Sequence, residues 1–269
     1  MDAMIRSQGY STRRFQTLQS AYYNKPSPLQ LASYELYMID AVKAFDHEIL
    51  AAAMGVGLSP NPCNAYAESL VHMVSRRGDA KALQILIDNG CNLQVSDDYG
   101  RLPLHDCCWA ADPAFEVADI ILAADPRLFY MTDARGAVPL SYVRKEHWPL
   151  WIEYLESKKD MLWPTRDIKK VGEEGPPALT LLEPNSRPMP DPENALTVEL
   201  AAMVASGKMK PEEAAFLKYD KGDGDAGDSS EEDDDDDEGD SEFDSDYDSD
   251  DDSQDDADMA DILSNYSAR

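Results

Sequence analysis

The sequence predicts an all-α fold, in which a solenoid of stacked helix pairs is followed by a disordered acidic tail. The chain is similar to itself at shifts of 33 and then 36 residues, which is the signature of a repeat protein. Each similar segment holds two short apolar runs at helical spacing, so each predicts a pair of helices. The tail follows from residues 220–261, where 24 Asp or Glu stand against one Lys, because such a segment cannot offset the entropy of ordering its backbone.

The charge of the chain is divided unevenly. Residues 220–261 carry −23 of the net charge of −29, which leaves −6 for the rest. The amino terminus lacks the apolar run of a secretion signal, and no stretch approaches the roughly 18 apolar residues needed to cross a bilayer. We therefore expect a soluble intracellular protein, cytoplasmic or nuclear, whose four cysteines are reduced thiols.

The first part of the predicted fold is a partly ordered N-terminal arm, residues 1–26. Ser27 suits a helix cap, Pro28 a first helical turn and Gln30 the reciprocal partner of the cap. This helix opens the predicted repeat domain, residues 27–162, and covers its first end.

The repeats themselves follow from aligning the chain with itself. At a shift of 33, NAYAESLVHMVSRRGD lies over DDYGRLPLHDCCWA and His72 falls on His105. At a shift of 36, DARGAVPLSY lies over DDYGRLPLHD and Gly136 falls on Gly100. A degenerate first unit places Gly57 under Gly90, so the chain holds about four units.

Helix boundaries within these units can be read from single residues. Asp79 suits a helix start, and Gly90 suits the left-handed position after a helix. Two helices of about ten residues bury too little apolar area alone and need neighbouring pairs on both sides. We expect Trp148, Trp151 and Leu155 to close the last end of the stack.

These segments resemble the ankyrin repeat over residues 34–160. The ankyrin pattern combines a D-x-x-G turn, a T-P-L-H helix start and a G-A-x-x-N loop, and NGCNLQVSDDYG and DDYGRLPLHDCC carry it best. It implies helix-turn-helix pairs joined by β-turn loops. The chain departs from the pattern at Leu70 in place of Pro, Leu102 in place of Thr and Ser141 in place of His.

Beyond the repeats the composition changes. Residues 163–193 are rich in proline without a period, which predicts an extended linker. Residues 194–219 predict a helical hairpin, with a marginal helix within the linker as the alternative. Residues 220–269 form the predicted disordered tail.

The segment YGRLPLHDCC raises the question of an enzyme or metal site, because His105, Asp106, Cys107 and Cys108 are consecutive. Consecutive residues scatter around a helix axis. The resemblance implies instead that His72 and His105 bond neighbouring turns and that the two cysteines pack as small apolar residues. The chain has no C-x-x-C, Walker loop, G-x-S-x-G, H-E-x-x-H or EF-hand pattern. We expect no catalytic residue, no metal and no cofactor.

The resemblance also implies where a partner would bind, on a concave surface of loop tips and inner helices. The positions mapped there are Tyr66, Glu68, Arg76, Arg77, Asp98, Tyr99, Arg101, Trp109, Arg135 and Lys145. Its large aromatic residues are typical of an interaction surface, although Trp109 can alternatively fold into the core over residues 110–114. Its arginines and lysine predict a basic groove to which the acidic tail of the same chain binds.

These observations favour a non-enzymatic adaptor or scaffold that binds another protein. The alternatives are a nuclear factor whose acidic tail engages histones or other basic proteins, and a regulatory part of an enzyme complex. Direct binding of nucleic acid is not expected because the chain is acidic, and neither is membrane binding. The tail also predicts phosphorylation by an acid-directed kinase, since six serines have Asp or Glu three residues later: Ser229, Ser230, Ser241, Ser245, Ser249 and Ser253.

Overall fold

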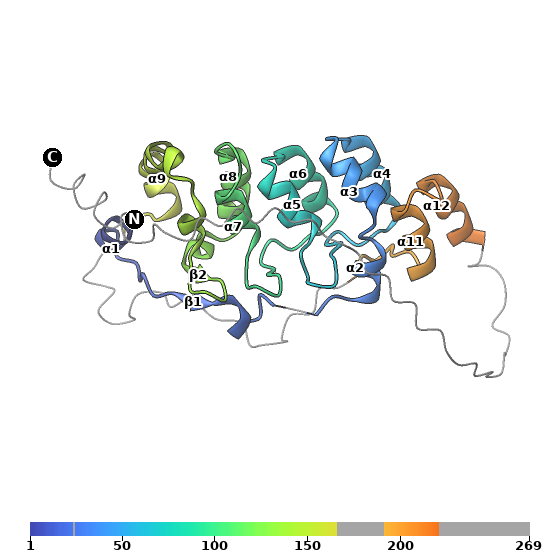
Figure 1. Ribbon diagram of the computed structural model, residues 1–269, viewed down its shortest axis with the longest axis horizontal. Coiled ribbons are helices and arrows are strands. Elements are labelled where there is room, and N and C mark those ends of the chain that lie inside the picture. The colour runs from blue at the N-terminus through green and yellow to red at the C-terminus, as the bar shows by residue number, and fades with distance from the viewer. Residues whose placement is uncertain (24, 166–190, 221–269) are drawn as a thin grey trace. The chain divides into compact units, whose positions relative to one another are not determined.

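The computed structural model describes residues 1–23, 25–165 and 191–220, and these residues are mostly helical (Figure 1). The strands in this part of the chain are β1 and β2, each of two residues, which pair in parallel. The all-α class is therefore confirmed. None of the described helices is long and apolar enough to span a bilayer.

In chain order the elements are α1 (Asp2–Ser7), β1 (Phe15–Gln16), η1 (Thr17–Gln19), α2 (Pro28–Ala32), α3 (Leu36–Lys43), α4 (His47–Val56), α5 (Leu70–Arg76), α6 (Ala80–Asp88), α7 (Pro103–Cys108), α8 (Phe115–Ala124), η2 (Pro126–Tyr130), β2 (Met131–Thr132), η3 (Pro139–Tyr142), η4 (Lys145–His147), α9 (Trp148–Leu162), α11 (Val198–Ala205) and α12 (Pro211–Asp220).

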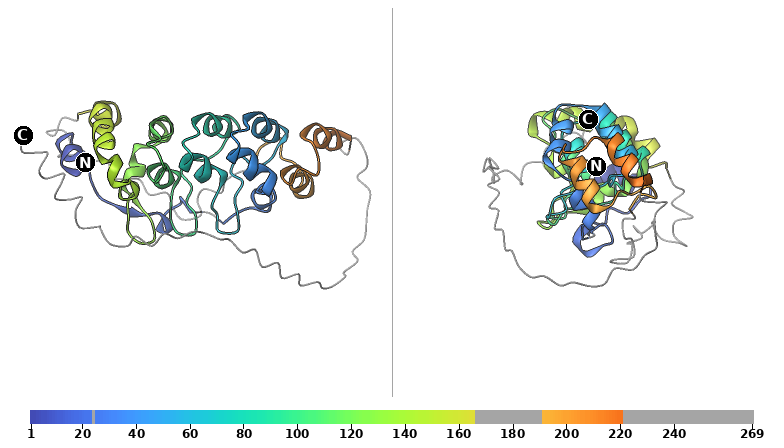
Figure 2. Two further views of the ribbon diagram at one scale, coloured as in Figure 1. Left: turned by 45° about the horizontal axis from the view of Figure 1, so that its top comes forward. Right: turned by 90° about the vertical axis from the view of Figure 1, so that its right-hand side faces the viewer.

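Three helix pairs, α3 with α4, α5 with α6 and α7 with α8, follow one another in space as they do in the sequence (Figures 1 and 2). The first helix of each pair contacts the first helix of the next, and α4, α6 and α8 contact one another in the same way. Leu70, Leu83, Leu104 and Ile121 are fully buried between them. Each pair thus uses its neighbours to bury its apolar side chains.

The residues predicted to begin and end helices do so. The Asp79 side chain accepts the Ala82 N–H at 3.0 Å, and Asp46, 33 positions earlier, accepts the Ile49 N–H at the same distance. Ser27 and Gln30 form the expected reciprocal cap at the start of α2. Gly90 follows Asn89, the C-cap residue of α6, and has a left-handed φ of +90°.

The loops between pairs share one hydrogen-bonding pattern. The side-chain oxygens of Asn64, Asp97 and Asp133 each accept two backbone N–H groups, from residues two and four positions later. Such turns need a polar side chain at the first position. Successive loops are then joined through their backbones, because Asp98 donates to the Tyr66 carbonyl at 3.0 Å and Ala134 donates to the Tyr99 carbonyl at 2.8 Å.

The expected role of the two histidines is confirmed. Nδ1 of His72 accepts the Ser69 N–H, and its Nε2 lies 3.0 Å from the Arg101 carbonyl of the next loop. His105 repeats this arrangement, with Nδ1 accepting the Leu102 N–H at 3.0 Å and Nε2 lying 3.3 Å from the carbonyl of Ala137. Each buried ring therefore joins one loop to the next.

The fourth unit differs from the others. Its first helix is the single 3₁₀ turn η3. The buried Val143 and four exposed or half-buried polar residues, Arg144 to His147, separate that turn from α9. Ser141 stands where His72 and His105 cap the preceding helices, so the imidazole acceptor is missing. Residues 144–147 offer no apolar face that could pack against the preceding unit. The 3₁₀ turn η3 is therefore not extended into a longer helix.

The last helix, α9, closes this end of the stack as expected. Trp151 and Leu155 are buried, and Phe115 of α8 stacks on Tyr154 with ring centroids 4.6 Å apart. Trp148 is only partly buried and donates its indole N–H to the Val143 carbonyl at 3.0 Å.

The N-terminal arm crosses the loops in the reverse order of the repeats. Gln8 donates to Asp160 of α9 at 2.9 Å, and β1 then pairs with β2. The Thr17 hydroxyl lies 2.6 Å from the Gly100 carbonyl and 3.0 Å from that of Thr132. The carbonyl of Tyr22 accepts the Ser96 N–H at 2.7 Å. The structure describes every residue of the arm except 24, and the arm holds a helix, a strand and a 3₁₀ turn.

The hairpin predicted for residues 194–219 corresponds to α11 and α12, which end at Asp220 and pack against the first helices of the stack. The Leu196 N–H and the Asn194 side-chain amide donate to the carbonyls of Gly57 and Gly55, each at 2.9 Å. Ala201 and Val204 are buried where α11 contacts α2 and α3, while α12 contacts α4. We refer to α11 and α12 as the C-terminal hairpin.

Several predictions fall on residues 166–190 and 221–269, which lie outside the described residues. They are most of the linker, the acidic tail and all six candidate phosphorylation sites, Ser229, Ser230, Ser241, Ser245, Ser249 and Ser253.

Candidate functional site

The loops of the second and third units present large aromatic side chains to solvent. Tyr66 is 61% exposed and Tyr99 is 59% exposed. Asp98 precedes Tyr99, is exposed, and is held by the bond from its N–H to the Tyr66 carbonyl. Trp109, at the end of α7, is 37% exposed. We call Tyr66, Asp98, Tyr99 and Trp109 the aromatic face.

Beside this face, Arg76 forms a network that joins α5 to α7. Its guanidinium contacts Asp106 Oδ1 at 2.5 Å and Glu68 Oε1 at 3.0 Å. The same guanidinium lies 4.9 Å from the centre of the Trp109 ring. Burial raises the pKa of Asp106, and the charge of Arg76 opposes that rise.

Arg101 is held in the same manner by the loop of the third unit. Its Nε lies 2.6 Å from Oδ2 of Asp97, a carboxylate that is completely buried. Its guanidinium is 5.4 Å from the centre of the Tyr99 ring. Glu68 and Asp106 are also near enough to act on Arg101 electrostatically, so the two arginine networks adjoin.

These contacts correct the expectation of one open basic groove. Arg76 and Arg101 are neutralised by carboxylates of the protein itself. Arg77 points elsewhere, because it donates to the Lys43 carbonyl at 2.7 Å and lies 4.7 Å from the Phe45 ring. Arg135 and Lys145 are exposed on the fourth unit. The sequence does not show these pairings, because the carboxylate of Asp106 lies 30 positions from Arg76 and meets it only in the folded chain.

Trp109 lies between the two alternatives considered for it. One side of the indole packs on Arg76, and its edge meets Tyr142 with ring centroids 6.5 Å apart. More than a third of the residue nevertheless stays exposed. It therefore contributes to the packing between units and to the surface.

The segment with His105, Asp106, Cys107 and Cys108 is buried along its whole length. Burial raises the pKa of both cysteine thiols and so disfavours the thiolate that nucleophilic chemistry requires. Burial also lowers the pKa of His105 to about 4. Within the described ranges no three His, Cys, Asp or Glu side chains are gathered in a way that could hold a metal ion.

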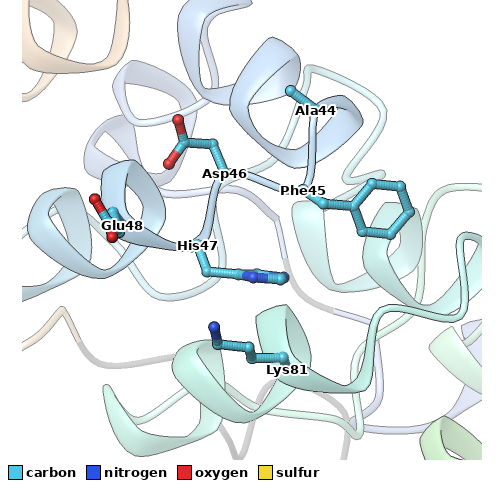
Figure 3. A pocket seen from close by; sticks show the side chains of 6 residues that line it. All are labelled: Ala44, Phe45, Asp46, His47, Glu48 and Lys81. Atoms are coloured by element: carbon cyan, nitrogen blue, oxygen red, sulfur yellow. The ribbon is translucent and has the colours of Figure 1, made fainter.

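A shallow depression lies between the starts of α4 and α6 (Figure 3). Its lining residues are Ala44, Phe45, Asp46, His47, Glu48 and Lys81. His47 Nε2 lies 2.9 and 3.0 Å from the two oxygens of Asp79, and both Asp46 and Asp79 cap helices. The polar groups of this depression thus hold two neighbouring helix pairs together.

Sequence reasoning missed three residues of the site, Asp97, Asp106 and Tyr142. Asp97 and Asp106 hold the two arginines, and the Tyr142 hydroxyl donates to Asp133 at 2.6 Å. The signal was present in the repeat frame, because Asp106 follows His105 and Tyr142 follows Ser141 at the same inner-helix position. No protein-family model matches this chain, and a search of curated proteins found no similar sequence.

Proposed function

We propose that this chain is a non-enzymatic adaptor of the ankyrin-repeat type, which binds another protein through its aromatic face. The repeat assignment is supported by the repeated Asx turns, the paired helices and the two histidines that bond one loop to the next. In such an array each unit contacts only its neighbours, and loops and inner helices supply an extended binding surface.

The observation that carries the proposal is the exposure of Tyr66 and Tyr99 on loops fixed by backbone hydrogen bonds. Large aromatic side chains lose little conformational entropy on binding and dominate interface energetics. A rigid frame lowers that cost further. Trp109 adds a third ring whose position is set by Arg76.

The test compares two triple variants of the full chain. One replaces Tyr66, Tyr99 and Trp109 with Ala, and the control replaces Leu150, Met161 and Phe216, which are 46%, 60% and 70% exposed on α9 and α12. Proteins are captured from an extract of the cells that make this chain, quantified by mass spectrometry, and each candidate is then purified and titrated directly.

We expect a partner that the parent and the control retain and the aromatic variant loses, with at least about a tenfold fall in affinity. Equal affinity of all three proteins, with helicity unchanged, would show that the aromatic face does not bind. Loss of binding by both triple variants would point to a change of fold. Circular dichroism would detect that change as a loss of helicity.

The acidic composition of residues 220–261 favours a second candidate, in which the tail engages basic proteins. That function requires no aromatic face. It predicts capture of the same partners by the aromatic variant, and loss of those partners when the acidic residues of the tail are replaced by Asn and Gln.

A further inference from the structure

The arginines beside the aromatic face are already committed to the protein's own carboxylates. Arg76 bonds Asp106 and Glu68. Arg101 bonds Asp97, which also accepts the N–H groups of its own turn. Neither guanidinium is therefore a free donor for an acidic partner, and an exposed ion pair formed by displacing these contacts would gain little.

Negative charge is in excess on this part of the molecule. Beside the aromatic face, Glu68, Asp97, Asp98 and Asp106 provide four carboxylates against the two arginines Arg76 and Arg101. Of the other cations of the predicted site, Arg77 lies against Lys43 and Phe45, and Arg135 and Lys145 lie on the fourth unit.

One carboxylate in this region has capacity for a further donor. The exposed carboxylate of Asp98 carries a hydrogen bond from Tyr23 and is in no ion pair among the described residues. A cationic donor is the group that bonds such a carboxylate most strongly.

The exposed rings favour the same chemistry. The face of a tyrosine ring attracts an ammonium or guanidinium group, and Arg101 already lies against Tyr99. Tyr66 and Tyr99 leave more than half of their surface free. Exposed rings next to an exposed carboxylate therefore favour a cation over a neutral or acidic group.

We propose that the aromatic face recognises a segment of a partner protein that bears lysine or arginine, with the cation over the rings of Tyr66 and Tyr99 and Asp98 as its acceptor. This inference rests on the proposed function. It makes the chain's own acidic tail an unsuitable ligand for the face, contrary to the expectation from sequence.

The experiment titrates the full-length, ¹⁵N-labelled chain with three peptides of about 12 residues at about 150 mM salt, where charges are screened over about 8 Å. The first peptide alternates Arg with Gly and Ser, the second replaces each Arg with neutral citrulline, and the third replaces each Arg with Glu. The amide signals of Tyr66, Asp98 and Tyr99 report on the face, and the signals of residues 221–269 report separately on the tail.

We expect the arginine peptide to shift the three face signals and the citrulline and glutamate peptides to leave them nearly unmoved. Asp98→Asn should weaken this binding about fivefold. Asp88→Asn removes one charge from an exposed position on α6 and should leave the affinity unchanged.

The inference is overturned if the arginine peptide shifts tail signals alone, if citrulline or glutamate binds the face as well as arginine does, or if Asp98→Asn and Asp88→Asn behave alike. A face that binds uncharged or acidic peptide would still be a protein-binding face. The proposed function itself fails only when a purified partner binds the aromatic triple variant as tightly as the parent.

Discussion

The helix pairs α5 to α8 are held by contacts of a different kind from those of the N-terminal arm and the C-terminal hairpin. Between the pairs, the histidine bonds join residues 29 and 32 positions apart, and the same bond recurs from one unit to the next. The N-terminal arm instead joins Thr17 to residues 83 and 115 positions away, and Gln8 to Asp160 at a separation of 152. The histidine contacts recur at the period of the sequence repeat, whereas each contact of the N-terminal arm occurs once.

These two segments also contact opposite ends of the stack. The N-terminal arm reaches α9, and the C-terminal hairpin reaches α2, α3 and α4. Terminal units of a repeat array need a cover because they lack a neighbour on one side. The difference teaches that contacts between repeats stabilise the middle of the stack, whereas segments outside the repeats stabilise its two ends.

The largest expected effect lies within the repeats. His105→Ala removes a buried ring, the acceptor of the Leu102 N–H and the bond to Ala137, and should lower the free energy of unfolding by about 3 to 5 kcal/mol. His147→Ala, at a half-buried position on η4, should change it by no more than about 0.5 kcal/mol. Chemical denaturation followed by circular dichroism measures both, and equal losses would contradict the role given to His105.

The same histidine predicts a dependence of stability on pH. Burial lowers the pKa of His105 to about 4, whereas an unfolded histidine titrates near 6.5. Between these values the unfolded chain binds the proton and the folded chain does not, so stability falls as the pH falls from about 6.5 to about 4. The loss due to this group should approach about 3 kcal/mol.

The His105→Gln variant isolates that contribution, because glutamine does not titrate. Its free energy of unfolding should vary less with pH than that of the parent across this window. Parallel curves for the two proteins would show that His105 does not keep its proton off in the folded state.

The next effect sharpens the comparison at a point where repeat and arm meet. Gly100 has a φ of +76°, and a Cβ there would lie 2.5 Å from Thr17 Oγ1. Gly136 occupies the same place in the next unit with a φ of +85° and no atom within 4 Å of its Cβ. Gly100→Ala should cost about 2 to 3 kcal/mol and Gly136→Ala about 1 kcal/mol. A difference near zero would mean that the arm contributes nothing at this position.

The smallest effect on global stability concerns the C-terminal hairpin. A Cβ on Gly57 would lie 1.9 Å from the Asn194 carbonyl oxygen, whereas one on the equivalent Gly90 meets nothing within 4 Å. Both glycines have positive φ, so Gly57→Ala and Gly90→Ala share the backbone cost of about 1 kcal/mol. We expect the hairpin to separate from α4 without unfolding it, so the additional change should be local.

Hydrogen exchange measures this local change. Amides of α11 in Gly57→Ala should exchange at least about tenfold faster than in Gly90→Ala, while α5 to α8 exchange alike in both. Equal protection of α11 in the two variants would show that the hairpin does not depend on its contact with Gly57.

Much of the middle of the chain could be predicted because its determinants are local. Asp79 and Ser27 cap helices, Gly90 adopts a left-handed φ, and His72 and His105 bond the next loop. The exception, the 3₁₀ turn η3, occurs where Ser141 replaces the histidine. For the candidate site the exposed positions of Tyr66 and Tyr99 were predicted, and the pairing of Arg76 with Asp106 was not.

The sequence by itself determined the helix pairs, their order and the loops that join them, since caps, turns and apolar spacing act within about 36 residues and recur. Only the tertiary structure decided the path of the N-terminal arm, the position of the C-terminal hairpin and the charge of the aromatic face. Those features depend on which residues of distant segments meet: Thr17 with Gly100, Asn194 with Gly55, and Arg76 with Asp106. A hydrogen bond or ion pair between segments leaves no period in the chain, so its partners become known only when the fold brings them together.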